Sequence, residues 1–114
     1  MPNVNPDLDA LHGALVRIHG VLYERLGQAT DPKVAQAILT EMQEVTHRLD
    51  LVQILLFTRA TAAITAAVSN VQSATAGLNA ALNSIQTAAN VVQGCTTFLG
   101  IIDEALDLAK LAAA

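Results

Sequence analysis

Aromatic residues are scarce in this 114-residue chain, which has no tryptophan, one tyrosine and two phenylalanines. Its hydrophobic content of 53% comes mostly from Ala, Leu, Val and Ile. Ala and Leu are strong helix formers, whereas sheets draw on aromatic and β-branched residues. The composition therefore predicts an all-α protein. Because this length suits one hydrophobic core, we expect a single domain over residues 1–114.

Basic residues are also few, with six Lys plus Arg against ten Asp plus Glu and a formal net charge of −4. A protein that binds nucleic acid needs a cationic surface to neutralise phosphates. Nucleic acid is therefore not an expected partner.

Cysteine occurs once, at Cys95, so no disulfide can form within the chain. A lone cysteine fits a reducing compartment, and the polar N-terminal stretch lacks the cationic start and apolar run of a secretory signal. We expect synthesis and residence in the cytoplasm, and export by a signal-independent route remains an open alternative.

Motifs for catalysis and for metal binding are missing. The sequence contains no GxSxG, no glycine-rich phosphate loop and no CxxC. Glu44 and His47 form one Glu-x-x-His pair, but di-iron bundles need two such pairs. His12 and His19 lie two turns apart on a predicted helix, too far to share one ion. We therefore predict no enzyme activity and no catalytic, cofactor-binding or metal-binding residues.

The first predicted helix covers about residues 6–26. Asn5 can cap it, Pro6 suits its first turn, and Gly27 is a typical stop. One apolar stripe runs along it at steps of three and four: Leu8, Leu11, Leu15, Ile18, Leu22 and Leu26.

A second, long helix is predicted over about residues 32–76, beginning at Pro32 after a short linker. The short linker makes the first two helices antiparallel neighbours. Apolar residues spread around nearly the whole circumference from Leu51 to Phe57. This stretch is therefore predicted to be central to the core.

The segment between Arg59 and Asp103 contains 43 residues and no charge. Large aliphatic residues recur in it every seven positions, with a small residue three positions after each, a pattern that lets two helices approach closely. The predicted contact residues are Ile64, Ala67, Val71, Ala74, Leu78, Ala81, Ile85, Ala88 and Val92.

One straight helix from Pro32 to Leu111 would be about 120 Å long at 1.5 Å per residue, so the chain is expected to turn within this segment. We place the turn at Gly77 to Asn79, with a last helix over about residues 79–111 and further weak points at Gly94 and Gly100. The predicted architecture is a short N-terminal helix packed on a long antiparallel helical hairpin. This is a three- or four-helix bundle with a coiled-coil-like, Ala-rich contact.

The neutral segment also carries the predicted function. A protein that self-associates, or binds a dedicated protein partner, through an uncharged small-residue surface is the favoured interpretation. The first alternative is a membrane-active protein whose hairpin over residues 60–102 inserts conditionally. The second alternative is a small immunity protein or chaperone that masks a toxin.

Overall fold

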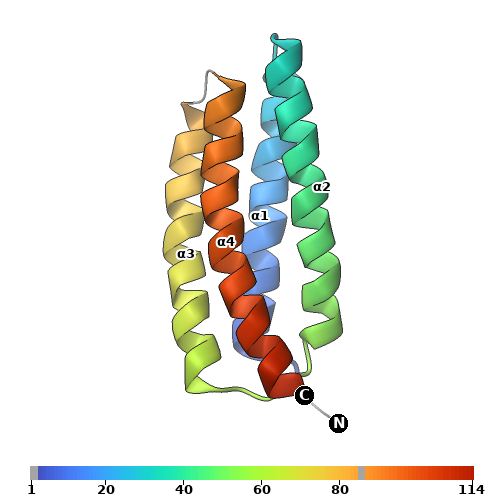
Figure 1. Ribbon diagram of the computed structural model, residues 1–114, viewed down its shortest axis with the longest axis vertical. Helices are drawn as coiled ribbons and strands as arrows, with labels where there is room; N and C mark the ends of the chain where they lie inside the picture. Colours follow the sequence, from blue (N-terminus) through green and yellow to red (C-terminus); the bar gives the residue numbers. More distant parts are fainter. Residues whose placement is uncertain (1–2, 85–86) are drawn as a thin grey trace.

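The computed structural model describes residues 3–84 and 87–114, which form four helices in a bundle of 48 × 21 × 18 Å (Figure 1). The helices are α1 (Pro6–Gln28), α2 (Pro32–Leu55), α3 (Ala62–Asn83) and α4 (Ala88–Ala113). The all-α fold class predicted from composition is confirmed.

Each helix begins at a side chain that accepts a hydrogen bond from a backbone N–H of the first turn. The four N-cap residues are Asn5, Asp31, Thr61 and Thr87. Proline follows the cap in α1 and α2, where its missing N–H costs nothing. These local signals fix where the helices start.

The bundle has an order that differs from a simple up-and-down meander. α1 packs against α2 and α3, and α4 packs against α2 and α3, so α1 and α4 lie on one diagonal. α1 and α3 point in one direction and α2 and α4 in the other (Figure 1). The connection from α2 to α3 therefore crosses one end of the bundle along the other diagonal.

Asn5 holds this crossover in place. Its side-chain oxygen caps α1 by accepting from the N–H groups of Asp7 and Leu8, and its Nδ2 donates to the carbonyl of Thr58 at 2.9 Å. Its backbone N–H donates to the carbonyl of Leu56 at 2.7 Å. Asn5 is only 3% exposed, so one buried side chain ties the start of α1 to the diagonal connection.

The long helix predicted over residues 32–76 is wrong, because the chain leaves the helical path between Leu55 and Ala62. No glycine or proline occurs from Leu56 to Thr61. The break is instead made by the Thr61 cap, which accepts from the N–H of Ile64 at 3.2 Å, and by the backbone contacts with Asn5. The bundle thus has four helices of similar length rather than a short helix on a long hairpin.

The predicted turn at Gly77 to Asn79 is also wrong, because α3 continues to Asn83 and α4 begins at Ala88. Among the described residues no glycine adopts a positive φ, so Gly77, Gly94 and Gly100 are ordinary helical residues. Arg25 of α1 donates to the Asn83 carbonyl at 2.7 Å, which satisfies a free carbonyl at the end of α3.

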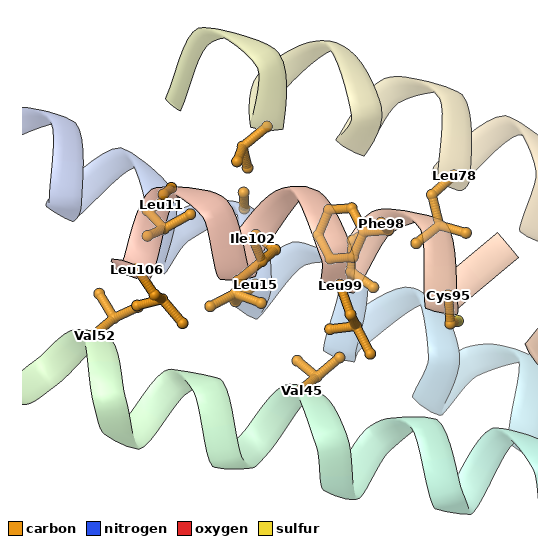
Figure 2. Packing of buried hydrophobic residues seen from close by; sticks show 14 of the residues in the cluster. Leu11, Leu15, Val45, Val52, Leu78, Cys95, Phe98, Leu99, Ile102 and Leu106 are labelled. Carbon is orange, nitrogen blue, oxygen red and sulfur yellow. The ribbon is translucent and has the colours of Figure 1, made fainter. Parts of the chain in front are cut away.

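The core lies along the bundle axis and is built from aliphatic side chains of all four helices. In Figure 2, Leu99 and Leu106 of α4 point toward Val45 and Val52 of α2, so both helices contribute residues seven apart. Phe98 is the only buried aromatic ring among the described residues and is 2% exposed. The core is therefore almost entirely aliphatic.

The stretch from Leu51 to Phe57 is less central than predicted. Val52 and Leu55 are buried, but Ile54 is 78% exposed and Phe57 is 59% exposed. Ile54 lies within α2 outside its buried stripe, and Phe57 lies beyond the end of the helix at Leu55.

Candidate interaction surface and an acidic cleft

The uncharged segment forms one continuous side of the bundle. Every exposed residue of α3, and of α4 from Ala89 to Gly100, is small, hydroxylated, an amide or aliphatic. We call these exposed residues the neutral face. The charged side chains lie on α1, on α2, on the connections and on α4 from Asp103 onward.

A groove of about 580 Å³ runs along the neutral face between α3 and α4. The groove is open because the residues that line it at Gly77 and Ala81 of α3 and at Gly94 of α4 have no long side chains to fill it. Leu78, Phe98 and Ile101 supply apolar surface, and the remaining lining residues are Ala74, Ser84, Asn90, Gln93 and Thr97.

The predicted contact residues are divided between the core and the surface. Ile64, Ala67, Val71 and Leu78 are buried inside the bundle, and Ala74 and Ala88 are half-buried. Ala81 and Val92 are exposed, whereas Ile85 lies outside the described residues. Four of these residues therefore serve packing within the chain, and Ala74 and Ala81 line the groove.

The seven-residue repeat does not continue as one stripe through α4. Val91 is fully buried while Val92 is 43% exposed, so the stripe that faces the core moves by one position after the turn. Beyond Val92, the next large residues of the repeat, Leu99 and Leu106, are buried again.

A second feature is a cleft of about 440 Å³ between α2 and α4. Three carboxylates line it, those of Glu41, Glu44 and Asp103, with one cation, Arg48. The other lining residues are Thr40, Thr96, Leu99 and Gly100. We call it the acidic cleft.

Arg48 is fully engaged at one side of the acidic cleft. Its Nε and Nη2 donate to the two carboxylate oxygens of Asp103 at 2.8 and 3.0 Å, and its Nη1 donates to Glu44 at 3.0 Å. The hydrogen bond with Asp103 raises the pKa of Arg48, burial opposes this, and Glu44 adds to the rise. The guanidinium is thus committed to two of the three carboxylates.

Glu41 is the third carboxylate and is 6% exposed. Its side chain has no hydrogen bond to any described residue, and burial raises its pKa, with a further rise from Glu44 that Arg48 partly offsets. Nearby, burial and the Glu41 charge raise the pKa of the Cys95 thiol to about 12. Such a thiol stays protonated at neutral pH and is a poor nucleophile.

The sequence carried a signal for this cleft that the motif analysis missed. Glu41 stands seven residues before Arg48, between Ile38 and Val45 in the stripe of α2 that faces the core. Two charges at core spacing mark an unusual site, because charged residues are rarely buried unless paired.

In the described part of the chain, no group of three or more His, Cys, Asp or Glu side chains is placed to hold a metal ion. Glu44 of the Glu-x-x-His pair binds Arg48 instead, and His47 is exposed. None of the helices built from residues 3–84 and 87–114 combines the length and apolarity needed to span a bilayer.

Comparison with protein-family models, with curated proteins and with solved structures finds no match for this chain.

Proposed function

We propose that this chain is a non-enzymatic assembly protein that binds a second copy of itself through the neutral face. The observation that carries the proposal is the combination of a full helix length without charge and an open apolar groove beside it. Leu78, Phe98 and Ile101 give the groove an apolar lining, and apolar patches rimmed by polar residues are typical of sites that associate.

Charge favours a second copy on this face over any other. The chain has a net charge of −4, so two copies repel each other overall. Contacts through α1, α2 or the end of α4 would also remove charged groups from water, which is costly unless each is paired. The neutral face has no charge to desolvate, so two copies meet there at the lowest electrostatic cost.

The size of the face suits a weak dimer. α3 has 22 residues, which corresponds to about 33 Å at 1.5 Å per residue, and the neutral part of α4 from Ala89 to Gly100 adds about 18 Å. With each helix about 10 Å wide, the face covers roughly 500 Å², below the ~800 Å² that each partner contributes to a standard interface.

The outer stripe of α3 has a symmetry that suits two identical copies. Six exposed small residues recur at steps of four, three, four, three and four: Ala62, Ala66, Ser69, Ser73, Ala76 and Ala80. The stripe reads the same in both directions, in spacing and in residue type. In an antiparallel pair of α3 helices, Ala62 lies opposite Ala80 of the partner subunit, and Ser69 lies opposite Ser73 of the partner subunit. A two-fold axis requires this reciprocity.

Light scattering after gel filtration tests the proposal over a range of concentrations. We expect a dimer for the wild type and a monomer for Ser73→Arg, which introduces a charge at the centre of the stripe. Gln43→Arg on α2 is the matched control, since it adds the same charge at an exposed position outside the face. A wild-type monomer at all concentrations, or equal loss of the dimer in both variants, would overturn self-association. A monomer that captures a different protein through Ser73 would favour the dedicated protein partner over self-association.

Cysteine cross-linking tests the antiparallel arrangement separately. An equal mixture of Ala62→Cys and Ala80→Cys chains should form a disulfide-linked dimer, while each variant alone should not. Cys95 can stay in place, because its pKa of about 12 keeps the thiol unreactive. Cross-linking of Ala62→Cys with itself would instead show a parallel pair and refute the proposed symmetry.

A further inference from the structure

The acidic cleft lies between α2 and α4 and is built differently from the neutral face. Its wall contains Glu41, a residue that is 6% exposed and whose carboxylate oxygens keep some contact with solvent in the cleft. The carboxylate lines the cleft and has no hydrogen bond to any described residue. A largely buried carboxylate without a hydrogen-bond partner is costly, so it marks a place where a cation would be favoured.

The cation already present does not meet this need. Arg48 donates to Glu44 and to both oxygens of Asp103, at distances of 2.8 to 3.0 Å. Arg48 is therefore bound to two of the three carboxylates, and with one guanidinium among three carboxylates the cleft keeps a net negative charge. His47, the neighbouring titratable group on α2, lines a different cavity together with Lys110.

The walls of the cleft indicate which kind of cation would fit. Thr40 donates its hydroxyl hydrogen to the carbonyl of Gln36 at 3.0 Å, so its oxygen is left to accept a hydrogen bond. Leu99 supplies an apolar wall, and at Gly100 an added Cβ would meet nothing within 4 Å, so the cleft is open there. An ammonium group with three donors and a short alkyl chain matches both the acceptors and the apolar wall.

A metal ion matches less well. Among the described residues no three ligating side chains are grouped for one, and Glu44 and Asp103 are held by Arg48. An ammonium group needs only one carboxylate and one hydroxyl oxygen as acceptors. The cleft offers these at Glu41 and Thr40.

We propose that the acidic cleft binds a primary alkylammonium group, with Glu41 as its counter-ion and Thr40 as a second acceptor. The alkyl chain lies against Leu99 and leaves the cleft past Gly100. A free amine and a lysine side chain present this same chemistry. The site is separate from the groove of the neutral face, so either proposal can fail without the other.

The test is titration of the wild-type protein with n-butylammonium chloride, followed by amide chemical shifts in NMR spectra. We expect saturable shifts centred on Glu41 and Thr96. Butanol, and sodium chloride at matched ionic strength, serve as controls for the apolar chain and for salt. N-acetyl-lysine amide distinguishes a side-chain ligand from a free amine, because its backbone must remain outside the cleft.

Three variants make the test specific. Glu41→Gln keeps the shape and removes the charge, and it should weaken binding at least tenfold, the loss expected for a charged hydrogen bond. Gly100→Leu leaves all charges in place and fills the opening, and it should also weaken binding. Glu24→Gln removes an exposed carboxylate on α1 and should bind like the wild type. No saturable response to butylammonium in the wild type, or equal affinity in Glu41→Gln, would overturn the site.

Discussion

Arg48 of α2 and Asp103 of α4, which are 55 residues apart in sequence, form a bidentate ion pair between the two helices. The Arg48 side chain is 14% exposed and the Asp103 side chain is 48% exposed, so the pair is partly screened from water. Paired, parallel hydrogen bonds of this kind fix geometry as well as adding energy. The pair sets the axial position of α4 against α2.

Replacing Arg48 by Met should therefore lower the free energy of unfolding by about 1–2 kcal/mol, because it removes a charged, half-shielded pair. Glu44→Gln should cost about 0.5 kcal/mol or less, since it breaks only an exposed pair one helical turn away. Urea unfolding of both variants, of Asp103→Asn and of the Arg48→Met/Asp103→Asn double variant gives the coupling energy. Additive effects in that cycle would show that the two side chains do not interact.

Asn5 provides the second prediction, because it both caps α1 and holds the crossover. Asn5→Ala should destabilise the bundle by about 2–3 kcal/mol, from a lost cap of about 1 kcal/mol and from a part-buried carbonyl at Thr58 that loses its donor. Asn5→Asp keeps the cap acceptor but cannot donate to Thr58, so its loss should be intermediate. Asp31→Ala is the control, since Asp31 caps α2 at an exposed position and should cost only about 1 kcal/mol. Equal losses at Asn5 and Asp31 would mean that the crossover contact contributes nothing.

Gly77 and Gly94 form a matched pair for the third prediction, since both are helical and face the same groove. An added Cβ at Gly77 meets nothing within 4 Å, whereas at Gly94 it lies 3.2 Å from Leu78 Cδ1. Gly77→Ala should stabilise the fold by about 1 kcal/mol, the usual gain in a helix interior. Gly94→Ala should gain much less, because Leu78 must move. Thermal unfolding of the two variants compares them directly, and a larger gain at Gly94 would contradict the packing described.

The starts of α1 and α2 and the fold class could be predicted from the sequence because their causes are local. Pro6 and Pro32 follow capping residues, and the first apolar stripe runs unbroken to Leu26. The break after Leu55 depends instead on a tertiary contact, since the hydrogen bonds of Asn5 to Leu56 and Thr58 join segments more than 50 residues apart. Within the segment itself, the local signal is the Thr61 cap alone.

The neutral segment misled the prediction for a different reason. Its seven-residue repeat is continuous in sequence from Ile64 to Leu106, but the chain turns between Asn83 and Ala88 and the two parts pack in different registers. The turn was predicted at Gly77 because glycines often mark helix ends. In the structure, Arg25 bonds the last turn of α3 and Thr87 caps the start of α4. The uncharged character of the neutral face could be predicted directly from the sequence. The acidic cleft could not, because it joins Glu41 of α2 to Asp103 of α4 and so depends on which helix packs against α2.

Glu41 provides the last prediction, in which stability depends on pH. Burial raises its pKa above the ordinary value of 4.5, so the folded protein holds this proton more firmly than the unfolded chain does. The stabilisation from the protonated form is fully present below about pH 4.5 and is lost as the pH rises through the raised pKa. Glu41→Gln mimics the protonated form, so it should be more stable than the wild type at pH 7, with the difference shrinking toward zero below pH 4.5. Urea unfolding across this range measures the difference, and Glu24→Gln, at an exposed position, should show no comparable trend. If Glu41→Gln is less stable than the wild type at pH 7, the carboxylate is paired in the free protein and the acidic cleft has no unmet charge to offer a ligand.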